Sequence, residues 1–485
     1  MQLYNTLTRR KEDFVSREPG KVGMYACGIT AYDYCHIGHA RSAIVFDVLA
    51  RYLRYQGLDV TFVRNFTDVD DKIIARANRE GVSGKELSER YIEAFHEDMD
   101  RLGVQRATLE PKATEHIPHM IALCETLIAK GKAYSTPSGD VYFRVRAFDG
   151  YGKLSGRSVD DLRSGARIAP GEEKEDPLDF ALWKGAKPDE PYWESPWGKG
   201  RPGWHIECSA MSEELLPLPL DIHGGGQDLI FPHHENEIAQ TEAATGKDFS
   251  RFWVHNGFVQ INAEKMSKSL GNFKTIRDIL DQYLPEVLRI FLLARHYRSP
   301  VDFTPEAMEE TEKNLKRLYE TLALLDEILA GPEPKGGALP EELQQECDAY
   351  ITGWTAAMDD DLNTAAAIGQ MNGLVHMVNR VLDDKALRKN LGVRAMLRTV
   401  REAFAAWSGV LGVAELPPRE FLTALKECRA RRKGIDAALV QSLMEERRTA
   451  RQNKDFAASD QLRDRLAAME VEVRDTPQGA VWDVM

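Results

Sequence analysis

The stretch from Val22 to Gly57 constrains the fold most, because it has the pattern of a strand, a turn and a helix in direct succession. Val22 to Cys27 is a short apolar run typical of a buried strand, and Gly28 to Cys35 follows as a loop. Apolar residues then recur at the spacing of one helix face: Ile44, Val45, Val48, Leu49, Tyr52 and Leu53. A helix that begins around Gly38 points unpaired N–H groups and its positive dipole end at the loop. This segment therefore predicts a site for a polyphosphate.

Four residues around this turn suit a nucleotide site. His36 and His39 flank the expected helix start, and each imidazole can donate to a phosphate oxygen. Gly38 leaves room for a nucleotide to lie against the backbone. Cys27, at the end of the strand, faces the same crevice, where ligands of open α/β sheets bind.

A second strand is predicted from Asp59 to Phe66, and Thr67 stands at its carboxyl end. Asp68, Asp70 and Asp71 then lead into a helix over residues 72–80. Carboxylates at this position can contact a ligand amine or ribose, but they can equally cap the helix. The sequence leaves both roles open for Asp70 and Asp71.

Another strand is predicted from Leu218 to Ile222, with His223 to Gly226 as its loop. A glycine run alone is a weak signal. The run is more informative at the end of this strand, because a flat purine bound there would need the backbone to approach it closely. Residues 228–246 are expected to form a helix opened by Pro232.

Composition bounds the class of protein. A chain of 485 residues is too long for one core and predicts about three domains. Its six cysteines are few and scattered, which favours free thiols in a reducing compartment. Without a signal peptide or a run of about 18 apolar residues, we expect a cytoplasmic protein with no membrane contact.

Charge is distributed unevenly along the chain. The formal net charge is −13, yet Lys426 to Arg465 holds eleven Lys or Arg against seven Asp or Glu, which gives +4. Such a run is either a solvated helix with internal ion pairs or a surface that binds RNA. The tail beyond it predicts a hairpin with Trp482 on its second strand, and an aromatic beside a basic helix can stack on an unpaired base.

Several short motifs carry the resemblance of this chain to a known family. His36-Ile37-Gly38-His39 resembles the HIGH signature of class I aminoacyl-tRNA synthetases, and Lys265-Met266-Ser267-Lys268-Ser269 matches their KMSKS signature. Cys27, Gly203 to Cys208, Asp221 to Gly226 and Phe231 to Glu237 narrow the resemblance to cysteinyl-tRNA synthetases, and it runs essentially end to end.

The resemblance implies an α/β fold: a Rossmann-type parallel-sheet catalytic domain with an inserted connective segment, an α-helical bundle and a small C-terminal anticodon-binding domain. In the bundle, Asp361 and Asn363 are expected to cap a helix. The expected divisions are catalytic halves at 1–117 and 201–250, the insert at 118–200, a KMSKS-bearing stem-contact region at 251–305, the bundle at 306–412 and a basic C-terminal domain at 413–485.

The same resemblance implies one Zn²⁺ per chain, held by Cys27, Cys208, His233 and Glu237. From spacing alone, His233 and Glu237 lie four apart on one face of a predicted helix, so both can reach one ion. Without the resemblance, each cysteine alone fits a small buried hydrophobe better than a metal ligand. Zinc would select cysteine over serine by bonding to the thiolate, with a fifth coordination position for the substrate.

The resemblance also implies which residues activate the amino acid and which bind ATP, the amino acid and tRNA. The catalytic residues expected are His36, His39, Lys265 and Lys268. ATP, accompanied by Mg²⁺, is expected to contact His36, Gly38, His39, His223, Gly224, Gly225, Gly226, Asp228 and Lys268, although Asp228 is equally suited to cap a helix. Gly28, Thr67 and Trp204 are expected to shape the amino-acid pocket. Arg431, Arg432, Arg447, Arg451 and Trp482 are expected to contact tRNA.

The expected function is therefore that of a monomeric cysteine–tRNA ligase with L-cysteine, ATP and tRNA(Cys) as partners. Two alternatives are open at this point. One is a cysteine ligase of the same fold that acts on an amino sugar, and the other is a non-catalytic zinc or RNA-binding relic. The amino-sugar ligase is disfavoured by the basic C-terminal region. The relic is disfavoured by the complete set of expected catalytic residues, His36, His39, Lys265 and Lys268.

Overall fold

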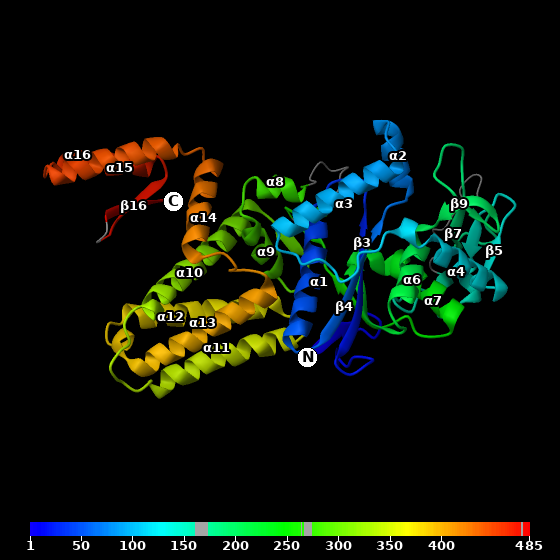
Figure 1. The fold of residues 1–485 in the computed structure, drawn as a ribbon, viewed down its shortest axis with the longest axis horizontal. Helices are drawn as coiled ribbons and strands as arrows, with labels where there is room; N and C mark the ends of the chain where they lie inside the picture. Colours follow the sequence, from blue (N-terminus) through cyan, green and yellow to red (C-terminus); the bar gives the residue numbers. More distant parts are fainter. Residues whose placement is uncertain (161–172, 263, 266–273, 477–478) are drawn as a thin grey trace.

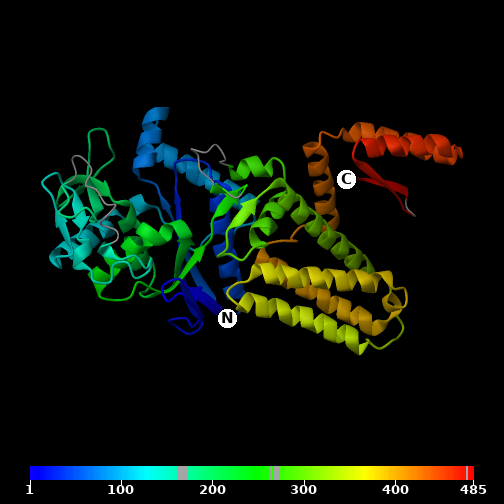
Figure 2. The same ribbon diagram turned by 180° about the vertical axis from the view of Figure 1, so that it is seen from behind.

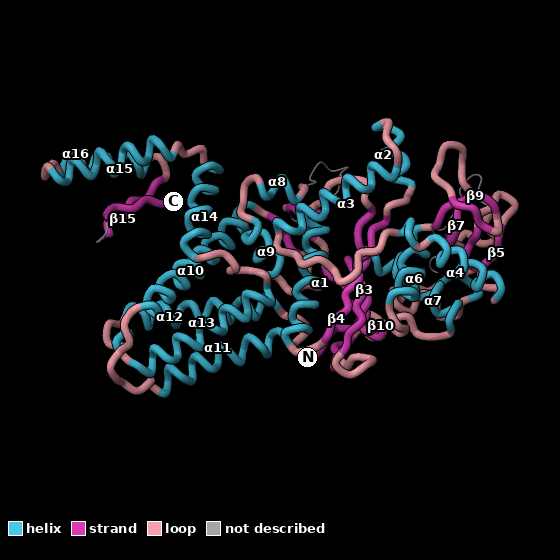
Figure 3. The backbone as a smooth tube through the Cα atoms, viewed as in Figure 1, coloured by secondary structure: helices cyan, strands magenta, loops and turns pink. Residues whose placement is uncertain are grey.

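The computed structural model describes residues 1–160, 173–262, 264–265, 274–476 and 479–485. At its centre lies a parallel sheet with the strand order β11-β10-β3-β4 (Figure 3). Its strands are β3 (Lys21–Thr30), β4 (Asp59–Thr67), β10 (Leu220–Gly226) and β11 (Ser250–Asn256). Ile222 pairs with Met24, so segments about 200 positions apart in sequence end at the same edge. That edge is where ligands of such sheets bind.

Helices cover both faces of this sheet. Helix α1 packs on one face through its apolar stripe, including Ile44 and Val48, while α6 and α7 belong to the core on the other face. The helices of this region are α1 (Ile37–Tyr55), α2 (Asp71–Glu80), α3 (Gly84–Arg101), α4 (Ile117–Ala129), α6 (Trp204–Leu215), α7 (Glu235–Thr245), α8 (Ile276–Leu280) and α9 (Pro285–Leu293), with the short helices η1 (Ala113–Glu115), η2 (Val145–Ala147), η3 (Gln227–Leu229) and η4 (Ile230–His234).

Three further sheets surround the central one. The segment between the two halves of the central sheet forms β5-β6-β7-β9-β8, with all pairs antiparallel. Its strands are β5 (Ala133–Ser135), β6 (Val141–Phe143), β7 (Phe180–Gly185), β8 (Trp193–Ser195) and β9 (Gly198–Pro202). The others are β1 (Gln2–Asn5) with β2 (Arg10–Asp13), and β12 (Val259–Ile261) with β13 (Glu264–Lys265) and β14 (Val301–Phe303).

The C-terminal part is helical and ends in a hairpin. Its elements are α10 (Pro305–Ala330), α11 (Glu341–Asp359), α12 (Thr364–Asp383), η5 (Leu387–Lys389), α13 (Leu391–Leu411), α14 (Pro418–Arg432), α15 (Ala437–Gln452), α16 (Phe456–Ala468), β15 (Val471–Thr476) and β16 (Gly479–Val484). The unit of α15, α16 and the hairpin has its own small core around Leu443 and Leu466. It lies at the opposite end of the molecule from the five-stranded sheet (Figures 1 and 2).

Asp361 makes one of the connections between the bundle and the catalytic half. Its buried carboxylate accepts from the Tyr4 amide at 2.8 Å, the Tyr297 hydroxyl at 2.8 Å and the Arg298 guanidinium at 2.7 Å. Asn363 caps α12 by accepting from the Ala366 amide, so the expected capping role is confirmed for Asn363. It is wrong for Asp361, which binds two segments distant in sequence, one at Tyr4 and one at Tyr297 and Arg298.

Two local expectations are corrected. The glycine run expected as a loop lies inside β10, which continues to Gly226. The helix expected over residues 228–246 is divided, and α7 begins only at Glu235, because Phe231 has the extended angles φ −140° and ψ 131°. Among the described residues, no helix is both long and apolar enough to span a membrane.

Glu286 gives a prediction on stability. Its carboxylate accepts from the Tyr319 hydroxyl at 2.6 Å and from the Ala414 amide, and burial raises its pKa from 4.5 to about 6. A raised carboxyl pKa means that the folded state binds the proton more tightly, so stability falls as pH rises from about 4.5 to 6. The shift corresponds to a loss of about 2 kcal/mol, complete above pH about 6.

Urea denaturation at pH 4.5 and pH 7 measures this effect. The free energy of unfolding of wild type should fall by about 2 kcal/mol between these two pH values because of Glu286. Glu286→Gln cannot lose this contribution, so its stability relative to wild type should be about 2 kcal/mol higher at pH 7 than at pH 4.5. Glu309→Gln, the same substitution at an exposed position of α10, is the control and should follow wild type. An equal pH dependence of stability in wild type and Glu286→Gln would contradict the assignment.

Candidate functional site: a nucleotide cavity beside a buried metal-ligand cluster

A cavity of about 460 Å³ opens at the carboxyl edge of the central sheet. This volume is typical of a site for a small-molecule ligand. Several of the predicted site residues line it: Cys27, Gly28, His36, Gly38, His39, Trp204, Gly226 and Asp228. They come from the ends of β3 and β10, the start of α1, the start of α6 and the turn η3. The topology therefore gathers into one cavity residues that the sequence separates by up to 200 positions.

The start of α1 is held by its own two histidines. The His36 Nδ1 accepts from the amides of Gly38 at 3.0 Å and His39 at 3.3 Å, and the His39 Nδ1 accepts from the His36 amide at 3.2 Å. The two rings stack with centroids 3.7 Å apart. Because each Nδ1 accepts a hydrogen bond, we assign the neutral tautomer with its proton on Nε2 to both rings. Both imidazoles are thereby fixed as Nε2–H donors.

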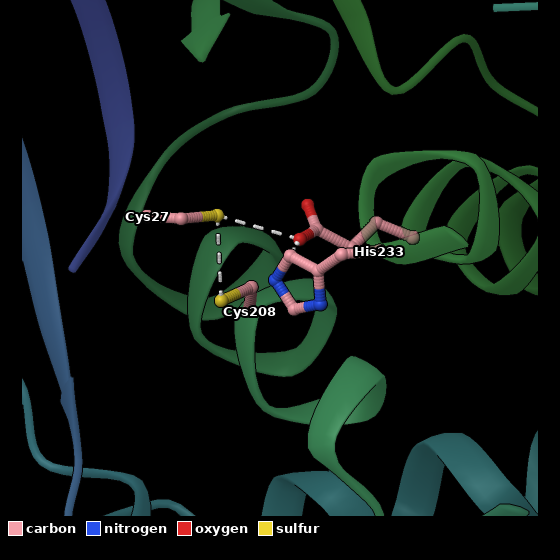
Figure 4. A group of neighbouring side chains, drawn as sticks. Cys27, Cys208 and His233 are labelled. Atoms are coloured by element: carbon pink, nitrogen blue, oxygen red, sulfur yellow. Dashed lines mark hydrogen bonds and ion pairs between the residues drawn. The ribbon is translucent and has the colours of Figure 1, made fainter. Parts of the chain in front are cut away.

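Four metal-ligand side chains converge on one point (Figure 4), and one of them, Cys27, lines the same cavity as His36 and His39. The Cys27 sulfur lies 3.7 Å from the Cys208 sulfur and 3.4 Å from the Glu237 carboxylate, which lies 2.7 Å from the His233 Nε2. The ligand atoms of all four residues lie within 4.8 Å of one another. The cluster comes from β3, α6, η4 and α7, so it joins both halves of the central sheet.

Neighbouring groups set the thiol pKa values within the cluster and the orientation of His233. A hydrogen bond from the Cys27 thiol lowers the pKa of Cys208 to about 6, whereas burial raises the pKa of Cys27 itself. The His205 Nδ1 lies 2.9 Å from the His233 Nδ1, which leaves the Nε2 of His233 directed at the cluster. Trp204 stacks on His233 at 4.3 Å and is 39 % exposed toward the cavity. This contact links the metal-ligand cluster to the cavity wall.

Some predicted site residues have surroundings other than those expected. The Thr67 hydroxyl is buried and donates to the Glu207 carboxylate at 2.6 Å. His223 is buried with its Nε2 2.7 Å from the Glu237 carboxylate, beside the metal-ligand cluster and not at the cavity wall. A Cβ on Gly224 would lie 2.1 Å from the Val254 carbonyl oxygen. Strand packing therefore already requires glycine there.

Sequence reasoning missed several residues near the site. Asn65 fixes the end of β3, because its side chain accepts from the Gly28 amide at 2.9 Å. A Cβ on Gly28 would meet the Asn65 carbonyl oxygen at 1.6 Å, so only glycine fits. His234 lies 3.3 Å from the Cys27 sulfur and 2.8 Å from His255. The available signal was the number of histidines in the motifs, since a polar side chain is costly to bury unless it is hydrogen-bonded.

The second signature lies partly outside the described residues. Lys265 ends β13, while Met266 to Ser269, with Lys268 among them, fall in the undescribed stretch. β13 belongs to a small sheet reached from the end of β11, which itself neighbours β10. The backbone of Lys265 is thus placed, and the positions of the remaining signature residues stay predictions.

The basic residues of the C-terminal region mostly have partners within the protein. Arg432 forms a bidentate pair with Glu312, both bonds 3.0 Å long, while Arg447 and Arg451 both bind Asp475. The Arg431 guanidinium reaches the Cys428 sulfur at 4.0 Å. Trp482 lies under the Lys426 ammonium at 4.5 Å. Contact of these residues with RNA stays a prediction.

Comparison with known proteins assigns the three parts of the chain. A family model described as tRNA synthetases class I (C) catalytic domain matches residues 13–313, one for the DALR domain matches 353–415, and one for the cysteinyl-tRNA ligase anticodon binding domain matches 437–482. The three matches follow the order of catalytic, helical and C-terminal parts in the structure.

Curated relatives are similar over the whole chain. A cysteine–tRNA ligase of Nitratidesulfovibrio vulgaris is 68 % identical over 485 residues, and one of Lawsonia intracellularis is 58 % identical, each with 100 % of both chains covered. A methionyl-tRNA synthetase of Mycobacterium tuberculosis shares the fold, with a TM-score of 0.61, 17 % identity and coverage of 81 % of this chain and 92 % of its own. The chain therefore belongs to the cysteine–tRNA ligase family and is a ligase that forms aminoacyl-tRNA.

Proposed function

We propose that the chain joins L-cysteine to tRNA(Cys) in two steps, using ATP. The observation that carries the proposal is the convergence of Cys27, Cys208, His233 and Glu237, with Cys27 lining the same cavity as His36 and His39. We propose further that it works as a monomer in the cytoplasm, where reducing conditions keep its six cysteines as thiols.

The donor set fits Zn²⁺. Two thiolates on a tetrahedral zinc, with Zn–S about 2.3 Å, lie about 3.8 Å apart. The sulfurs of Cys27 and Cys208 are 3.7 Å apart before any ion is considered. Two sulfurs, one imidazole and one carboxylate favour zinc over the hard cations Mg²⁺ and Ca²⁺. When bound, zinc supplies a Lewis acid that keeps the thiol of substrate cysteine as a thiolate, a ligand that the serine hydroxyl matches poorly.

Activation is the attack of the cysteine carboxylate on the α-phosphorus of ATP. A carboxylate oxygen–phosphorus bond forms, the bond to the β-phosphate oxygen breaks, and pyrophosphate leaves. His36 and His39 contribute Nε2–H donors to the phosphate oxygens, with the α1 dipole behind them. We assign Lys265 and Lys268 to the leaving pyrophosphate, with Mg²⁺ accompanying the ATP.

The remaining residues position the substrates. Gly28 and Trp204 line the cavity next to the metal-ligand cluster, on the side where cysteine must lie. Gly38, Gly226 and Asp228 line the part where we place ATP. In the second step a hydroxyl of the terminal tRNA ribose attacks the carbonyl carbon of the adenylate, and AMP leaves. Holding the reactants in line accounts for most of the acceleration expected.

The two alternatives are not favoured. An amino-sugar ligase does not need an anticodon-binding domain, but residues 437–482 match one. A catalytically inactive relic is not favoured either, since the curated relatives identical at 58 % and above are cysteine–tRNA ligases over their full length.

Ending the chain after Asp436 tests the proposal. The removed unit has its own core, and α14 stays held by the stacking of Phe421 on Tyr319 at 3.7 Å. Cysteine-dependent ATP–pyrophosphate exchange should be unchanged. The kcat/KM for charging tRNA(Cys) should fall about 100-fold, since each stacked base is worth about 1–3 kcal/mol.

Three results, one with the truncated chain and two with wild type, would contradict parts of the proposal. Normal charging of tRNA(Cys) by the truncated chain would contradict tRNA recognition by this unit. Wild-type protein that exchanges pyrophosphate with cysteine yet never charges tRNA would contradict the second step. Absence of exchange in zinc-loaded wild type would contradict the first step.

A further inference from the structure

A second cluster of metal-ligating side chains lies outside the site described above. It consists of His116, His119 and Glu214. His116 precedes the first residue of α4, His119 lies in the first turn of the same helix, and Glu214 lies in the last turn of α6. The Glu214 Oε2 is 2.5 Å from the His116 Nδ1 and 3.0 Å from the His119 Nδ1.

We propose that this cluster is a second binding site for a divalent transition-metal ion of the Zn²⁺ class. The three ligand atoms lie within 4.8 Å of one another. A nitrogen and an oxygen on one tetrahedral zinc lie about 3.3 Å apart, with bonds of about 2.0–2.1 Å. The observed separations of 2.5 and 3.0 Å therefore need to widen by less than about 1 Å to admit an ion.

The ligand types select the ion. Two imidazoles and one carboxylate favour Zn²⁺, Ni²⁺ or Cu²⁺ over Mg²⁺ and Ca²⁺, which prefer all-oxygen shells. The side chains of His116, His119 and Glu214 are 12, 52 and 29 % exposed, so solvent can complete the coordination. Three protein ligands with an open position distinguish this site from the buried four-ligand cluster.

An ion bound at this site would link helix α4 to helix α6. Helices α4 and α6 pack against each other (Figure 1). Glu214 lies in the last turn of the helix whose first turns carry Trp204 and Cys208. An ion shared by Glu214 and the two histidines ties this helix to the beginning of α4, which leads into the five-stranded sheet. Ion binding then stabilises the folded state, because the unfolded chain does not hold the three ligands together.

The test uses full-length protein that already contains one equivalent of zinc. Zinc chloride is titrated into it and the heat of binding is measured. Wild type is expected to take up one further ion, and His119→Ala and Glu214→Gln should each weaken this binding at least about tenfold, because even groups that only orient a ligand are worth 10–100-fold. His376→Ala, which removes an exposed histidine of α12, is the matched control and should bind like wild type.

Thermal denaturation gives a second readout. Excess zinc should raise the Tm of wild type and of His376→Ala but not that of His119→Ala. If wild type binds no second ion, the proposal is wrong. It is equally wrong if His119→Ala and Glu214→Gln bind the second ion as tightly as wild type, since the ion then lies elsewhere. Neither result affects the proposed charging reaction, which the truncation and exchange measurements test separately.

Discussion

Cys208→Ser is expected to lower the kcat/KM for cysteine in ATP–pyrophosphate exchange by about 10³-fold or more, since even groups that only orient a metal ligand are worth 10–100-fold. Zinc content should fall from one per chain toward zero. The Cys208 sulfur lies 3.7 Å from the Cys27 sulfur in a buried cluster that also contains Glu237. A serine hydroxyl stays protonated at neutral pH and is a poor zinc ligand, so the cluster loses its second thiolate.

Cys428→Ser is the matched control for this prediction. Cys428 is also buried, and its thiol donates to the Gln282 carbonyl at 3.3 Å, a bond that a serine hydroxyl can make too. Exchange activity, zinc content and preference for cysteine over serine should all match wild type. If Cys208→Ser kept full zinc and full preference for cysteine, recognition of the amino acid through this cluster would be disproved.

The parts of the fold that the sequence predicted are those set by local patterns. The strand and helix around Cys27 and His36 follow from one apolar run and one helical stripe, and the first strand of the second half is found near Leu220. The family relation and the class I architecture are confirmed by the matched catalytic, helical and anticodon-binding parts. Short-range periodicity and motif spacing are sufficient for such features.

What the sequence did not predict depends on contacts between distant segments. Gly224 was assigned to nucleotide approach, but its neighbours are the Val254 carbonyl and the ring of Phe46, which no local pattern relates to it. Asp361 has the sequence context of a helix cap and instead binds Tyr4 and Tyr297. His205 and His223 looked like members of motifs, and only folding places them around the buried metal ligands.

The second large effect is expected at His36, where two roles can be separated. The ring caps α1 through Nδ1 and, in our proposal, donates to a phosphate through Nε2. Asparagine is among the best helix caps, so His36→Asn keeps the capping acceptor and removes the Nε2 donor. Removing one hydrogen-bond donor that stabilises a developing charge lowers kcat by about 10²–10³-fold. His36→Ala removes both roles and should lose about 1 kcal/mol of stability in addition.

Steady-state exchange kinetics and urea denaturation of the two variants separate these contributions. Both variants should show the fall in kcat with a nearly unchanged KM for ATP, because the interaction strengthens as charge develops on the phosphate oxygens. Only His36→Ala should unfold at lower urea concentration. A His36→Asn variant with wild-type kcat would show that His36 acts only as a cap, and the phosphate contact would then fall to His39 alone. A His36→Asn variant as unstable as His36→Ala would instead contradict the capping geometry on which the Nε2–H assignment depends.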